Sequence, residues 1–138
     1  MKEFDLYPPM QHWLELYLKD KYKSADEIIV VDAHSERLDR VLRKYDIIQD
    51  IQIDVLGIVK KADKFKLFFI EAKKTNLTLR DLGQLWAYCK LIDPEEAFLL
   101  TSAGMGSLNK LLNVYKREDL LDFGDGKRIK KMKIAIWN

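Results

Sequence analysis

Two acidic residues and a lysine lie in apolar segments where unpaired charges are costly. Asp54 interrupts the run IQIDVLGIV, and Glu71 ends the run LFFIE two residues before Lys73. A carboxylate removed from water needs a cation, hydrogen bonds or a raised pKa to compensate for its lost hydration. Two such carboxylates are hard oxygen ligands, and water and phosphate can fill the other coordination positions of a divalent cation. The pattern therefore predicts a Mg²⁺ or Mn²⁺ site formed by Asp54 and Glu71, with Lys73 beside it.

A divalent cation next to a lysine favours the hydrolysis of phosphodiesters. The metal neutralises the phosphate charge, orients the substrate and lowers the pKa of a bound water. Lys73 could help to deprotonate that water, or stay charged and stabilise the transition state. The sequence leaves both roles open. An internal ion pair between Lys73 and one carboxylate is the structural alternative, and it leaves the second carboxylate unaccounted for.

A third group of polar residues follows on a predicted helix that begins near Leu77. Arg80, Gln84 and Tyr88 are spaced four residues apart and form one stripe, separate from the apolar stripe of the same helix. Guanidinium, amide and phenol groups can donate hydrogen bonds to phosphate oxygens, and such contacts position a substrate without reading its sequence. The stripe is therefore a candidate nucleic-acid contact.

Hydrophobic periodicity predicts one mixed sheet flanked by helices in a single α/β domain, 1–138. The expected helices are 10–22, 36–44, 77–92 and 107–116, and the expected strands are 28–31, 51–59, 65–72, 97–101 and 132–137. Strands 51–59 and 65–72 form a hairpin across a short polar turn. The hairpin brings Asp54 and Glu71 onto adjacent strands, but the register that decides whether they share a face stays open.

Composition sets limits on the class of protein. The chain has 138 residues, 48% of them hydrophobic and 33% charged, as expected for a soluble globular domain. No apolar run approaches the ~18 residues that a membrane span needs. A single cysteine, Cys89, allows no internal disulfide, and we expect a cytoplasmic protein without a membrane partner. The basic run KRIKKMK (127–133) could follow phosphates, but solubilising charges on an edge strand explain it better.

The order Asp, then Glu-x-Lys, then Gln-x-x-x-Tyr resembles the PD-(D/E)XK superfamily of restriction-endonuclease-like nucleases. The resemblance covers most of the chain, from about Glu15 to Leu112, although Ile53 stands where a proline often precedes the aspartate. It implies a restriction-endonuclease-like core in which a central hairpin carries the acidic residues. It also implies metal-dependent DNA cleavage with roles for the following residues: Asp54, Glu71 and the Ala72 carbonyl as metal ligands, Lys73 as catalytic lysine, Glu15 as a further acidic residue of the first helix, and Gln84 and Tyr88 as an auxiliary motif.

The segment TSAGMGSLNKLL (101–112) is similar to a strand–turn–helix that contacts DNA in members of this superfamily, which makes Ser102 and Gly104 candidate DNA contacts. The leading hypothesis is a Mg²⁺- or Mn²⁺-dependent DNA endonuclease that nicks DNA or recognises its structure. A chain this short holds no separate reading domain, so we expect a homodimer or a specificity partner. The alternatives are a non-catalytic nucleic-acid-binding or accessory module of the same fold, and an RNA-directed nuclease.

Overall fold

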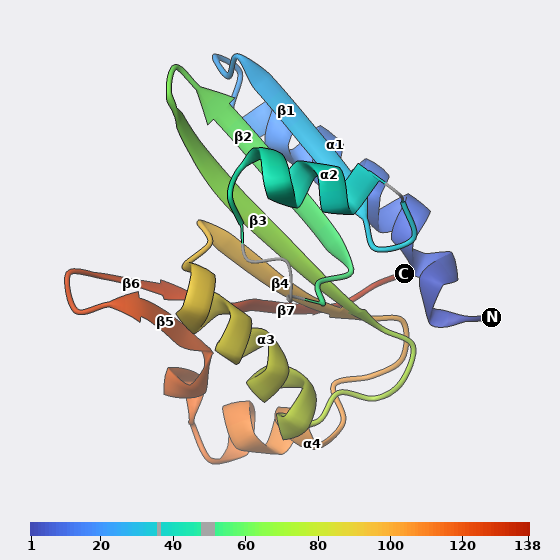
Figure 1. Cartoon of the computed structure of the whole chain (residues 1–138). Coiled ribbons are helices and arrows are strands. Elements are labelled where there is room, and N and C mark those ends of the chain that lie inside the picture. The colour runs from blue at the N-terminus through green and yellow to red at the C-terminus, as the bar shows by residue number, and fades with distance from the viewer. Residues whose placement is uncertain (36, 48–51) are drawn as a thin grey trace.

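Five strands form one mixed sheet at the centre of the computed structural model, which describes residues 1–35, 37–47 and 52–138 (Figure 1). The sheet order is β1-β2-β3-β4-β7, with antiparallel pairing from β1 to β3 and parallel pairing from β3 to β7. The strand bounds are β1 Glu27–Asp32, β2 Val55–Lys61, β3 Lys64–Lys73, β4 Glu96–Thr101 and β7 Lys133–Ile136. The mixed α/β architecture and the central hairpin are as predicted.

Helices cover both faces of the sheet (Figure 1). The helical segments are η1 Glu3–Leu6, α1 Tyr7–Lys21, α2 Arg37–Lys44, α3 Leu79–Ile92, α4 Ser107–Asn109, the π-helical η2 Lys110–Val114 and η3 Glu118–Leu121. Met10, Leu14 and Leu18 of α1 join the hydrophobic core on one face. The buried side chains of α2 and α3 join a second core on the other face. The two cores explain why β2 and β3 are apolar at nearly every central position.

Gly57 sets how closely α1 approaches the sheet. A Cβ atom at this position of β2 would lie 3.0 Å from both Leu14 Cδ2 and Leu18 Cδ1. Such contacts are tighter than ordinary packing allows, so a larger residue would displace α1. The absence of a side chain at Gly57 lets the leucines of α1 pack directly on the strand that leads from Asp54.

Helices α2 and α3 each begin with a capping side chain, as Ser35 and Thr78 predict. Thr78 and Asp81 form a reciprocal capping box at the start of α3, in which the Thr78 side chain accepts a hydrogen bond from the Asp81 N–H. The Ser35 hydroxyl accepts a hydrogen bond from the Arg37 N–H, 3.1 Å away, at the start of α2. Within the described residues, no helix is long and apolar enough to cross a membrane.

Three predicted elements differ from the structure. The strand expected over 51–59 begins at Val55, which leaves Asp54 in the bend before β2, while Ile51 lies outside the described residues. The helix expected over 107–116 ends at Val114, and Tyr115 is exposed because the segment unwinds through a π-helical turn. The segment 122–126 lies between the predicted helices and strands and is expected to be a loop, but it contains strand β5 (Asp122–Asp125), which pairs with β6 (Arg128–Lys131) in a separate hairpin.

Candidate functional site

The β2–β3 hairpin brings Asp54 and Glu71 together. Val55 pairs with Ile70 at the last step of this antiparallel ladder, so Asp54 and Glu71 face each other one step beyond it. Both side chains are buried, with exposed fractions of 8% and 6%. The structure thereby supplies the register that the sequence leaves open.

Two donors hold the Asp54 carboxylate in place. The Tyr7 hydroxyl donates to Oδ1 over 2.7 Å, and the backbone N–H of Ala72 donates to Oδ2 over 2.8 Å. Burial, followed by the hydrogen bond to Asp54, raises the pKa of Tyr7, so this hydroxyl keeps its proton at neutral pH. The two donors come from the first helix and from the neighbouring strand, and they fix the carboxylate at the junction of these elements.

The two carboxylates line a pocket of about 400 Å³. The lining residues come from η1, the β2–β3 hairpin and α3, together with Gln52, and they are Glu3, Gln52, Asp54, Glu71, Lys73, Gln84, Ala87 and Tyr88. Gln84 is exposed and Tyr88 is half-buried on the side of α3 that faces this opening. Five residues predicted to share a site therefore line one pocket: Asp54, Glu71, Lys73, Gln84 and Tyr88.

The electrostatics of the pocket are dominated by its acidic groups. Burial raises the pKa of Glu71 well above its usual range, and the neighbouring Asp54 raises it further, while Lys73 opposes the shift only in part. The pKa of Glu3 is also raised, chiefly by burial. Lys73 acts to lower the pKa of Glu3, and Asp54 acts to raise it. The pocket therefore favours the protonated, neutral form of Glu71, and an added cation would reverse that preference.

Lys73 forms its ion pair with a residue outside the carboxylate pair. Its Nζ lies 3.9 Å from Asp81 Oδ1, and both side chains are largely buried. Asp81 also caps α3, so one carboxylate fixes the start of the helix and holds the lysine at the pocket. Among the ion pairs of the described residues, none joins Lys73 to Asp54 or Glu71, which argues against the internal ion pair considered above.

Five of the residues predicted to act here lie outside the lining of the pocket. Glu15 lies off the buried stripe of α1, which runs through Leu14 and Leu18, and it forms an ion pair of 2.8 Å with Lys19. Arg80 is exposed in the first turn of α3. Ser102 and Gly104 lie in the loop after β4, where the Gly104 N–H donates to the Asn76 side chain over 2.9 Å. Ala72 contacts the site through its N–H group.

Two polar lining residues, Glu3 and Gln52, are absent from the residues that the sequence predicts for the site. Glu3 lies four residues before Tyr7, on a backward extension of the stripe formed by Tyr7, Met10 and Leu14. That spacing is the signal that could have identified it, because residues four apart share a helix face. Gln52 lies between regular elements, and no periodic pattern places it.

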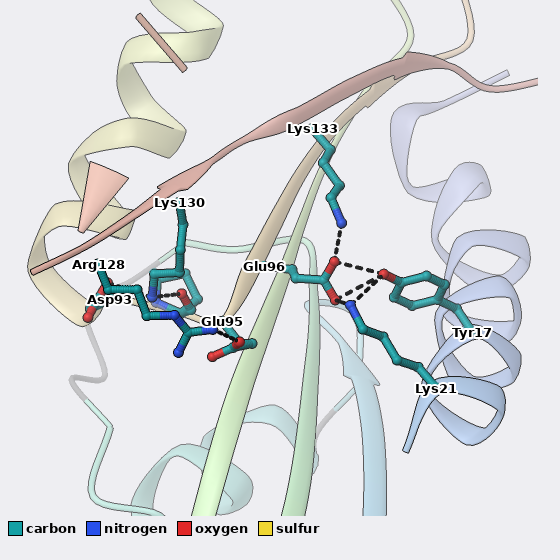
Figure 2. Close-up of polar contacts among 9 residues, drawn as sticks. Tyr17, Lys21, Asp93, Glu95, Glu96, Arg128, Lys130 and Lys133 are labelled. Atoms are coloured by element: carbon teal, nitrogen blue, oxygen red, sulfur yellow. Dashed lines mark hydrogen bonds and ion pairs between the residues drawn. The ribbon is translucent and has the colours of Figure 1, made fainter. Parts of the chain in front are cut away.

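A third buried carboxylate lies at the start of β4 (Figure 2), and it is not among the residues that line the pocket. Glu96 is 6% exposed and accepts hydrogen bonds from the Tyr17 hydroxyl over 2.7 Å, from Lys21 Nζ over 3.2 Å and from Lys133 Nζ. Burial alone would raise the pKa of Glu96, but the bonds from Lys133, Tyr17 and Lys21 together lower it. This carboxylate is thus neutralised by side chains of the chain itself.

The C-terminal basic run is also largely paired with acids. In this run, Arg128 contacts Glu95, Lys130 contacts Asp93, Lys131 contacts Asp122 and Lys133 contacts Glu96 (Figure 2 shows three of these pairs). The run therefore ties β6 and β7 to α3, β4 and β5, with acidic partners already in place. This pairing is a structural reason for the basic run that differs from both interpretations drawn from the sequence.

Donor chemistry at the pocket suits a hard divalent cation, although the carboxylates alone do not complete its coordination. Among the described residues, no three His, Cys, Asp or Glu side chains are grouped closely enough to hold a metal ion. Asp54 and Glu71 would therefore act as metal ligands together with oxygen atoms of water and phosphate, as is usual for magnesium.

No protein-family model, curated protein or solved structure matches this chain. The fold and the pocket define the molecule as a mixed α/β protein with a buried acidic pair.

Proposed function

We propose that this protein is a metal-dependent nuclease that hydrolyses phosphodiester bonds of DNA, with the acidic pocket as its active site. The observation that carries the proposal is the pairing of two buried carboxylates, Asp54 and Glu71, beside a lysine in one pocket. A bound Mg²⁺ or Mn²⁺ would neutralise the phosphate and make a water molecule more acidic. Such a core would be restriction-endonuclease-like, in keeping with the resemblance of the Asp, Glu-x-Lys and Gln-x-x-x-Tyr order.

Asp54 and Glu71 are the groups that would hold the cation. Asp54 is oriented by two hydrogen bonds, and Glu71 is opposite it on β3. Glu3 lines the same pocket, although it is not grouped closely enough with Asp54 and Glu71 to form a three-carboxylate site, and we expect it to act in place of Glu15. A pair of carboxylates without a direct cationic partner is poorly suited to a purely structural role, because neutral donors alone satisfy Asp54 and burial disfavours the charged form of Glu71.

The remaining polar residues would position the substrate. Lys73 is held at the edge of the pocket by Asp81 and presents an ammonium group to the phosphate. Gln84 and Tyr88, one helical turn apart on α3, offer an amide and a phenol to phosphate oxygens. We expect this site to act on DNA structure or to produce nicks, and a second copy would serve the opposite strand.

The test is nicking of supercoiled plasmid DNA in Mg²⁺ or Mn²⁺. We expect Asp54→Asn and Lys73→Met each to lower the rate by about 100-fold or more. Asp63→Asn and Lys74→Met are matched controls, because both residues are exposed and lie outside the pocket. Circular dichroism verifies that all four variants are folded. Full activity of Asp54→Asn would refute the proposal, and cleavage of RNA but not DNA would change its substrate.

A further inference from the structure

Helix α2 presents a concentration of positive charge to solvent. Its sequence RLDRVLRK contains four basic residues and one acidic residue, Asp39. Arg37, Arg40, Arg43 and Lys44 are all exposed. Among the described residues, none of the ion pairs includes any of these four, whereas the C-terminal basic run is paired with acids. Positive charge on α2 is therefore available to an external anion.

Three of these cations surround one groove. Arg37, Arg40 and Lys44 line a hollow of about 280 Å³ together with Ile29 and Val41. Their spacing of three and four residues places them on one stripe of the helix, so the charges follow a line along it. Guanidinium groups bind phosphate oxygens through two parallel hydrogen bonds, which suits them to a row of phosphates.

The groove lies on the same face of the sheet as the helix that borders the acidic pocket. Both α2 and α3 pack on this face (Figure 1). Gln84 and Tyr88 of α3 line the pocket. The chain also passes the pocket just before α2, since the Ala33 N–H donates to the Asp54 carbonyl over 2.9 Å. A polynucleotide with one phosphate in the pocket would thus have the α2 groove on the same side of the protein.

We propose that the α2 groove binds the phosphodiester backbone of a nucleic-acid duplex and positions it for the acidic pocket. The choice of a nucleic acid as the ligand rests on the proposed function. The choice of the α2 groove as its binding surface rests on charge complementarity. Contacts to phosphate set the position of a duplex without reading its sequence, which fits a nuclease directed by structure. Arg37, Arg40 and Lys44 are positioning residues in this arrangement.

The experiment measures binding in EDTA, so that cleavage does not contribute. Fluorescence anisotropy with a short labelled DNA duplex, and with an RNA duplex of the same sequence, gives affinity as a function of salt. For Arg40→Gln/Lys44→Gln, the slope of log K against log [salt] should fall by about 0.9 for each lost phosphate contact. Lys64→Gln/Lys66→Gln is the control with the same loss of charge at the turn of the β2–β3 hairpin, and its slope should stay that of the unmodified chain.

A further variant tests the same surface in the opposite direction. Asp39→Asn removes the acidic residue of α2 and should tighten binding of the duplex. Because Asp39, Arg40 and Lys44 are all exposed, these changes spare the core, and circular dichroism verifies folding.

The outcomes separate this inference from the proposed function. Equal slopes for the α2 variant and its control would overturn the inference even if plasmid nicking proceeds. Binding that depends on α2, without any nicking in Mg²⁺ or Mn²⁺, would support the inference and refute the nuclease. Absence of duplex binding, or binding of phosphatidylserine vesicles instead of a duplex, would overturn the assignment of a nucleic-acid partner.

Discussion

Two regions of this molecule bury carboxylates, and the two regions differ in how the buried negative charge is compensated. At the start of β4, Glu96 receives hydrogen bonds from Lys21, Lys133 and the Tyr17 hydroxyl (Figure 2). At the end of the β2–β3 hairpin, Asp54 receives only neutral donors in the described contacts, and Glu71 lies opposite it. The first region has its own cations, while no cation of the described residues is in direct contact with the acidic pair of the second.

The pKa shifts follow from this difference. Burial would raise the pKa of both glutamates, but the donors around Glu96 reverse the effect and lower its pKa. Around Glu71, burial and Asp54 act in the same direction and raise the pKa. A charged carboxylate is therefore the stable form of Glu96, and it is costly at Glu71. The comparison distinguishes a structural carboxylate from one suited to bind a cation from solution.

Removing the lysines of each region should give the largest contrast. Lys21→Met/Lys133→Met leaves the buried Glu96 with a single neutral donor, and we expect the free energy of unfolding to fall by about 3 kcal/mol. Lys73→Met removes only a long contact with Asp81 and should cost less than about 1 kcal/mol. Urea denaturation measures both. Equal losses would show that Lys73 compensates the acidic pair after all.

Added metal should stabilise one region and leave the other unaffected. A ligand that binds only the folded state, at a concentration 100 times its Kd, raises the free energy of unfolding by about 2.7 kcal/mol. We expect Mn²⁺ to raise the melting temperature of the unmodified chain and of Glu96→Gln. Asp54→Asn and Glu71→Gln should show no such rise. A rise that persists in both pocket variants would place the metal elsewhere.

The parts of the site that the sequence predicts are those governed by local periodicity. Glu71 and Lys73 share a strand face, and Gln84 and Tyr88 share a helix face, so spacing alone groups each pair. The approach of Asp54 to Glu71 depends on hairpin register, which a sequence with an unmarked turn does not fix. The structure supplies that register through the pairing of Val55 with Ile70.

Contacts between distant segments account for what the sequence does not predict. The Tyr7 hydroxyl donates to Asp54, which lies 47 positions later in the chain. Glu3, in the short helix just before Tyr7, lines the pocket, whereas the predicted Glu15 does not. The sequence Asp-Pro-Glu before Glu96 predicts a loop, yet Glu96 is the first residue of the buried strand β4. Its lysines come from the first helix and the last strand of the sheet, so no local pattern relates them to it.

Replacing each glutamate by its amide should change stability in opposite directions. Without metal at pH 7, Glu71→Gln should raise the free energy of unfolding by about 1 kcal/mol, because the neutral amide, unlike the carboxylate, needs no proton from solution when it is buried on folding. Glu96→Gln should lower it by about 1 to 2 kcal/mol, because hydrogen bonds to a charged group are lost. Urea denaturation of both variants checks the signs. A loss in both would mean that the two carboxylates are stabilised alike.

The pH dependence of these differences follows from the same shifts. Glu71 has a raised pKa in the folded protein, so its favourable contribution is complete below about 4.3 and is lost as the pH rises. The advantage of Glu71→Gln should therefore grow between pH 5 and pH 8, because this range lies above the usual carboxyl pKa of about 4.3. Glu96 has a lowered pKa, so its contribution is present above about 4.3 and is lost on acidification. The deficit of Glu96→Gln should shrink as the pH falls through the lowered pKa of Glu96.

The two tyrosines provide the smallest and most closely matched comparison. Tyr7 donates to Asp54 and Tyr17 donates to Glu96, each over 2.7 Å, so Tyr→Phe removes the same hydroxyl from both regions. Glu96 keeps two lysines after this change, whereas Asp54 keeps only the Ala72 N–H among its described donors. Tyr7→Phe should therefore cost about 0.5 to 1 kcal/mol more than Tyr17→Phe in urea denaturation.

Metal affinity distinguishes a positioning role of Tyr7 from simple stabilisation. If the Tyr7 hydroxyl orients Asp54 toward a cation, Tyr7→Phe should weaken Mn²⁺ binding by about 10-fold, as expected for loss of a group that orients a metal ligand. Tyr17→Phe should leave Mn²⁺ affinity unchanged, because Glu96 is already neutralised by its own lysines. Equal Mn²⁺ affinities in the two variants would contradict the role of Tyr7, even if their stabilities differ as expected.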